Sequence, residues 1–133
     1  MTSPHYPDDR LYHEENLWIR NLAEPGKAVI GVSHFAQDQL GDIVSITLPS
    51  VGQRMSFGSA FGEIEAAKVV SDLIAPADGT VIACNTELEG DPTLVNSDCY
   101  GGGWLVHIEI DEAIDHHPLM TAEKYRSHVG GDD

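Results

Sequence analysis

One lysine in this 133-residue chain stands where a single amine would be offered to another molecule. Two alanines precede Lys68, strand-like runs flank it, and Glu65 and Asp72 are close to it in the sequence. This pattern is typical of a β-hairpin tip, where small neighbours let a second protein approach the backbone. The alternative is a surface lysine among counter-charges, an arrangement that contributes about 0–1 kcal/mol and needs no function.

The elements that would position Lys68 are short and mostly β. The apolar runs, bounded by glycine and proline turns, predict strands at 17–22, 28–32, 43–48, 61–65, 69–74, 80–84 and 104–110. Helices are expected at 34–40 and 121–128, with Ser33 and Thr121 as N-caps, and one helical turn near 92–95. Phe35 and Leu40 would face the core from the first helix. Many short strands with few helices predict a β-sandwich or barrel.

Length and composition restrict the function further. The length suits a single domain, and we expect a flexible N-terminal arm at 1–10, a domain at 11–128 and a frayed tail at 129–133. Seven basic and 22 acidic residues give a net charge of −15, which disfavours nucleic-acid and anionic-membrane partners. No secretory signal or membrane-spanning run is apparent, and two cysteines make no disulfide framework. We therefore expect a cytoplasmic protein.

Residues 62–73, GEIEAAKVVSDL, resemble the lipoylation motif of the glycine cleavage system H protein family. Four further blocks are similar to the family in the same order, at 31–44, 75–81, 94–98 and 100–105. The resemblance implies a mostly β barrel-sandwich hybrid, as in lipoyl and biotinyl carriers, with two antiparallel sheets and a few short peripheral helices, one of them C-terminal. It also implies lipoate amide-linked to Lys68. The neighbours Ala67 and Val69, where biotin carriers have methionines, favour lipoate over biotin.

A carrier of this family is not an enzyme; its lipoyl arm moves cargo between partner enzymes. Family members usually have His-Glu before the first-strand tryptophan, and that glutamate contacts the amine of the loaded arm. Here Asn16 and Leu17 precede Trp18, so these two residues would line the groove for the arm without supplying the carboxylate. Strand alternation is not expected to bring Glu14 or Glu15 there instead.

The missing carboxylate favours a cargo without a cation. The sequence is similar in this respect to the H-like lipoate-binding proteins of sulfur-oxidising bacteria, which carry sulfur intermediates to a heterodisulfide-reductase-like complex. Cys99, where the family usually has proline, would be a redox thiol in that setting. The alternative is the H protein of the glycine cleavage system, which carries the aminomethyl group. Glu65 and Asp72 would flank the cofactor in either case.

The partners follow from the same resemblance. Lipoate-attaching enzymes and dihydrolipoamide dehydrogenase are expected, together with either the heterodisulfide-reductase-like complex or glycine decarboxylase and aminomethyltransferase. No metal site is predicted, because the acidic and histidine cluster near the C-terminus matches no zinc or calcium spacing. That cluster comprises Asp111, Glu112, Asp115, His116 and His117.

Overall fold

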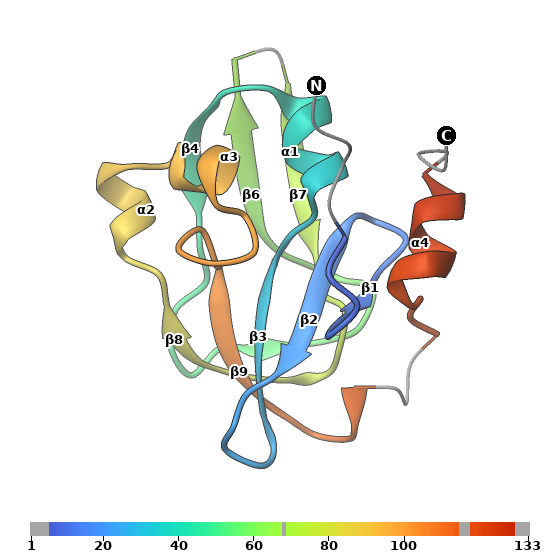
Figure 1. The fold of residues 1–133 in the computed structure, drawn as a ribbon. Coiled ribbons are helices and arrows are strands. Elements are labelled where there is room, and N and C mark those ends of the chain that lie inside the picture. Colours follow the sequence, from blue (N-terminus) through green and yellow to red (C-terminus); the bar gives the residue numbers. More distant parts are fainter. Residues whose placement is uncertain (1–5, 68, 115–117, 130–133) are drawn as a thin grey trace.

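A computed structural model describes residues 6–67, 69–114 and 118–129 of the chain. Within these residues, nine strands form two antiparallel sheets, with four short helices at their margins (Figure 1). The larger sheet has the order β1-β2-β3-β9-β8-β5 and the smaller one β4-β6-β7. The strands are β1 (Leu11–Tyr12), β2 (Leu17–Asn21), β3 (Lys27–Val32), β4 (Ile43–Thr47), β5 (Arg54–Met55), β6 (Ala60–Ala66), β7 (Val70–Ile74), β8 (Gly79–Cys84) and β9 (Val106–Ile110). The helices are α1 (His34–Leu40), α2 (Glu87–Gly90), α3 (Leu94–Ser97) and α4 (Ala122–His128).

The predicted barrel-sandwich architecture is confirmed, and β2 shows how it is built. Leu17 and Ile19 point into the core between the two sheets, while Trp18 points the other way. Trp18 there joins a second apolar cluster beneath α4, where the rings of Tyr12 and Tyr125 stack 4.7 Å apart. Leu17, Trp18 and Ile19 are all buried, because α4 and the N-terminal segment cover the face that the core leaves free.

Local sequence signals place the helix ends. Helix α1 begins after Ser33, whose hydroxyl accepts the Ala36 N–H at 3.1 Å, and ends at Gly41 with φ of 78°. Thr121 caps α4 in the same way, accepting the Lys124 N–H at 3.2 Å. Both N-caps are therefore confirmed. The two-residue strands β1 and β5 and the helix α2 were not predicted, since such short elements carry no periodic pattern.

Part of the N-terminal segment differs from the predicted flexible arm. Tyr6 and Arg10 are only 4% and 8% exposed, and the Arg10 guanidinium lies 4.4 Å from the centre of the Trp18 ring. Tyr6 packs edge-on against Tyr125, so residues 6–10 belong to the folded domain. Residues 1–5 and 130–133, the ends of the predicted arm and tail, lie outside the described residues. None of the described helices has the length and apolar character needed to cross a membrane.

Candidate functional site

The predicted hairpin is formed by β6 and β7. The Ala66 N–H donates to the Val69 carbonyl at 2.8 Å, which closes the hairpin at its end. Lys68 itself lies outside the described residues, whereas its neighbours Ala67 and Val69 are described and exposed. The antiparallel register sets Glu63 opposite Asp72 and Glu65 opposite Val70.

The end of the hairpin is anchored to the rest of the fold. The Ala67 N–H donates to the Asp42 carbonyl at 3.2 Å, between α1 and β4. This connection is in turn bound by Asn96 of α3, which accepts the Ile43 N–H at 3.0 Å and donates to the Gly41 carbonyl at 2.8 Å. The block at 94–98 that resembled the family thus supports the hairpin, a role its sequence did not reveal.

The surface around the hairpin end is acidic with apolar side chains among the charges. Glu63, Glu65 and Asp72 are exposed, and Glu63 and Asp72 are direct cross-strand neighbours of like charge. Like charges so placed are destabilising, and no described basic residue forms an ion pair with them. Val44, Val69 and Val70 are exposed by 51%, 47% and 56%. A surface of this kind suits contact with a partner more than it suits stability.

A groove of about 300 Å³ lies between the hairpin, α1 and the turn before β2. Its lining is largely apolar: Leu17, Val32, Phe35, Ala36, Leu40, Ile64 and Leu73, with Gln39 and Ser71 among them. Asn16 and Leu17 both line it, as the sequence indicated for an arm groove. Phe35 and Leu40, expected to face the core, pack against the two apolar clusters; both are half-buried and also line the groove.

Glu15 also lines the groove, contrary to expectation. Strand β2 begins only at Leu17, so the alternation of a strand does not govern Glu15. Glu15 lies in the turn that precedes β2, where the Asn16 N–H donates to the His13 carbonyl at 2.8 Å and Asn16 has a φ of 75°. Asparagine tolerates this left-handed conformation better than most residues. With Asp72, the groove therefore has two carboxylate residues in its lining.

His13 holds the shape of this turn. Its Nδ1 accepts the Glu15 N–H at 2.9 Å, and its ring packs against Phe57 with centroids 5.1 Å apart. Burial lowers the pKa of His13, so the neutral ring that accepts this bond is favoured. Glu14 lines an adjacent cavity of about 390 Å³ and not the groove.

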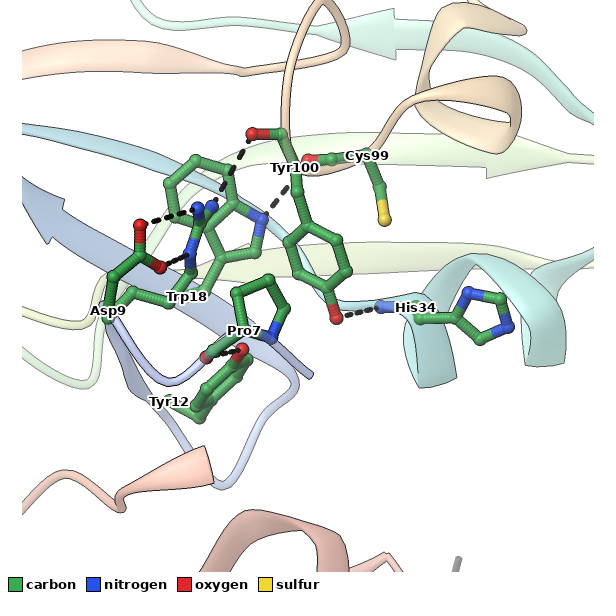
Figure 2. A network of polar contacts seen from close by, with 8 residues as sticks. Pro7, Asp9, Tyr12, Trp18, His34, Cys99 and Tyr100 are labelled. Atoms are coloured by element: carbon green, nitrogen blue, oxygen red, sulfur yellow. Dashed lines mark hydrogen bonds and ion pairs between the residues drawn. The ribbon is translucent and has the colours of Figure 1, made fainter. Parts of the chain in front are cut away.

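Cys99 is poorly placed for the predicted redox role. It is 6% exposed, and burial raises the pKa of its thiol to about 12, which leaves almost no reactive thiolate. Its backbone carbonyl accepts the indole N–H of Trp18, and the hydroxyl of the next residue, Tyr100, accepts the His34 N–H at 2.9 Å (Figure 2). The late loop thus positions β2 and the start of α1 through backbone and hydroxyl groups.

The C-terminal acidic cluster gives no support for a metal centre. Asp111 forms an ion pair with Arg54 at 2.6 Å, while residues 115–117 lie outside the described part of the chain. Among the residues that are described, no three histidine, cysteine or carboxylate side chains are grouped to hold a metal ion.

The geometry suits a tethered acyl chain. An apolar groove along the strands of the hairpin matches the hydrocarbon and dithiolane parts of a lipoyl group, and its volume is at the small end of ligand sites. The carboxylates of Glu15 and Asp72 would suit an amine carried at the end of such a chain. Lipoate therefore fits the residues that are present.

Comparison with known proteins agrees with this geometry. The sequence model of the family described as "Glycine cleavage H-protein" matches residues 10–131. The glycine cleavage system H protein of Micrococcus luteus is 46% identical over 92% of this chain and 96% of its own, and that of Bacillus cytotoxicus is 44% identical over 90% and 92%. The crystal structure of a glycine cleavage system H protein from Mycobacterium marinum superposes with a TM-score of 0.86, at 37% identity over 93% of this chain and 98% of that one. This chain therefore belongs to the glycine cleavage H-protein family, whose members are non-catalytic carrier subunits with lipoate attached to a lysine.

Proposed function

We propose that this protein is the H protein of a glycine cleavage system, with lipoate amide-linked to Lys68. The observation that carries the proposal is the family match over residues 10–131, together with relatives of that name at 44–46% identity. The hairpin flanking residue 68 supports the attachment point, because it presents small and exposed neighbours on an anchored support. Lipoate, when attached, supplies a dithiolane whose sulfur atoms take up and release the aminomethyl group.

The chain's own residues would bind and orient the arm. The apolar lining of the groove excludes water from the carried group, and Glu15 and Asp72 offer carboxylates to its amine. Glu65, which is exposed and is not in the groove lining, is placed for contact with a partner enzyme rather than with the groove. Tethering gives each transfer a high effective concentration, so the carrier needs no catalytic group of its own.

The partners proposed on this basis are glycine decarboxylase, aminomethyltransferase and dihydrolipoamide dehydrogenase, with lipoate-attaching enzymes acting earlier. Cys84 and Cys99 are both free, which is consistent with the reducing cytoplasm that we propose as its location.

The sulfur-carrier hypothesis, favoured from the sequence, is not supported by these comparisons. Its first argument was the carboxylate lost at Leu17, and Glu15 now supplies a carboxylate residue to the same groove. Its second argument was the thiol of Cys99, which is buried and has a raised pKa. The glycine cleavage alternative is the better reading of the chain.

The test is the exchange of labelled bicarbonate into glycine by glycine decarboxylase. Lipoylated protein is expected to support this exchange, while Lys68→Arg is expected to abolish it. Lys27→Arg is the matched control, because Lys27 is ion-paired with Glu24 in a turn away from the hairpin. Absence of exchange, with lipoylation verified by mass, would overturn the proposal and would reopen the sulfur-pathway carrier.

A further inference from the structure

A single tyrosine of the C-terminal helix reaches both walls of the groove. Tyr125 is fully buried, and its hydroxyl donates to the side-chain oxygen of Asn16 at 2.8 Å. The same hydroxyl is 2.7 Å from the hydroxyl of Ser33. Asn16 belongs to the turn that forms one wall, and Ser33 caps α1, which forms the other.

The donors and acceptors form one directed chain. Because the single proton of the Tyr125 hydroxyl is given to Asn16, the Ser33 hydroxyl must donate to Tyr125. Ser33 Oγ in turn accepts the Ala36 N–H at 3.1 Å. Hydrogen bonds in such a buried series strengthen one another. A backbone bond from the Ser33 N–H to the Asn16 carbonyl, at 3.0 Å, runs beside it.

The two tyrosine rings that pack against Tyr125 do not join the two walls of the groove. Tyr12 stacks on Tyr125, and Tyr6 packs edge-on against it. The Tyr12 hydroxyl donates to the Pro7 carbonyl at 2.6 Å and is also hydrogen-bonded to the side chain of Tyr100. The Tyr100 hydroxyl in turn accepts the His34 N–H of α1, so Tyr12 is linked to one wall only. The Tyr6 hydroxyl is buried and has no hydrogen-bond partner among the described residues. Only the Tyr125 hydroxyl therefore bridges the two walls among these three tyrosines.

We propose that Tyr125 is a positioning residue, through which α4 fixes the spacing of the two groove walls and so the protection of the carried group. The inference rests on the proposed function for the identity of that group. The structural part concerns this chain alone and applies without lipoate.

Three variants separate the bridge from general packing. Tyr125→Phe keeps the ring and removes the hydroxyl. Asn16→Gly removes the acceptor and keeps a residue that tolerates the positive φ. Tyr6→Phe is the matched control, since it removes a buried tyrosine hydroxyl that has no hydrogen-bond partner among the described residues.

The first measurement is amide hydrogen exchange of the unmodified protein. Tyr125→Phe is expected to speed exchange at the Ser33 and Ala36 amides by about fivefold to tenfold, relative to amides of β9. Tyr6→Phe is expected to leave both amides unchanged. Equal acceleration in the two variants, or none in Tyr125→Phe, overturns the bridge.

The second measurement is the half-life of the loaded state, in which the arm carries the aminomethyl group. The protein is loaded with glycine decarboxylase and glycine, and no aminomethyltransferase is present. Tyr125→Phe and Asn16→Gly are expected to shorten this half-life by about threefold or more, and Tyr6→Phe to leave it unchanged. An unchanged half-life in both groove variants overturns the inference. Failure of the wild-type protein to load is a different result, which counts against the proposed function.

Discussion

Trp18 and Cys99, 81 residues apart in the chain, are joined by one buried hydrogen bond: the indole N–H donates to the Cys99 carbonyl over 3.1 Å (Figure 2). The bond fixes the late loop to the first long strand, on the face opposite the core between the sheets. Cys99 thus contributes through its backbone and by filling space. On the adjacent strand, the residue that faces Trp18 must lack a side chain, because the indole ring lies close to it.

That neighbour is Gly31, and its replacement is expected to destabilise the fold. A Cβ at Gly31 would lie 2.5 Å from the Trp18 ring, which is fully buried and has no room to move. Gly31→Ala is expected to lower the free energy of unfolding by about 1–3 kcal/mol, the usual cost of overpacking. Urea denaturation measures this. Gly90→Ala is the control, with no atom within 4 Å of its added Cβ, and an equal loss there would contradict the steric explanation.

The two thiols are expected to react in a fixed order. Cys84 is half-buried and Cys99 is buried with a pKa raised to about 12, so iodoacetamide should modify native Cys84 first. In urea both should react. Cys99→Ala should still support glycine–bicarbonate exchange. Rapid labelling of native Cys99, or loss of exchange in the folded Cys99→Ala variant, would restore a chemical role for this thiol.

Acidification is expected to weaken the fold through His13. Burial lowers its pKa below the ordinary 6.5, so the unfolded chain binds the proton more readily than the folded one. The stability contributed by neutral His13 is therefore fully present above pH 6.5 and is lost as the pH falls through 6.5 towards the lower folded pKa. Burial also lowers the pKa of His107, which acts in the same direction.

His13→Asn isolates this effect, because an asparagine oxygen can accept the N–H two residues ahead and does not titrate. Between pH 7.5 and pH 5.5, about one unit on each side of the ordinary histidine pKa, the urea midpoint of unfolding is expected to fall less in the variant than in the wild type. Identical pH dependence in the two proteins would show that His13 does not titrate between these states.

The sequence predicted the elements whose signals are local. Ser33 marks the start of α1 and Gly41 marks its end, because a hydroxyl cap and a left-handed glycine are short-range requirements. The hairpin beside residue 68 was equally predictable, since two β-rich runs flank a short connection. The family resemblance added the sheet architecture.

The composition of the groove was not predictable in the same way. Glu15 lies in the turn just before β2, where Asn16 has a positive φ, so no alternating strand pattern predicts its place in the lining. The contact between Asn16 and Tyr125 joins residues 109 positions apart. The pattern of the polar N-terminal residues did not predict the burial of Tyr6 against α4 either. Such contacts depend on tertiary packing.

Glu15 provides a test of the groove itself. If its carboxylate meets the amine of the cargo, Glu15→Gln should shorten the half-life of the loaded protein by about threefold to tenfold, the scale of a partly solvated charge-assisted hydrogen bond. Glu14→Gln is the control, since Glu14 lies outside the groove and also loses one negative charge. Equal effects of the two variants would indicate a general charge effect and not recognition in the groove.

The account depends most on the group carried by Lys68, and peptide mapping by mass spectrometry measures it directly. Protein from cells with lipoate-attaching enzymes should carry one lipoyl group on the peptide that contains Lys68. Lys68→Arg should carry none, and Lys27→Arg should remain lipoylated. An unmodified Lys68 in protein that still supports glycine–bicarbonate exchange would contradict the account.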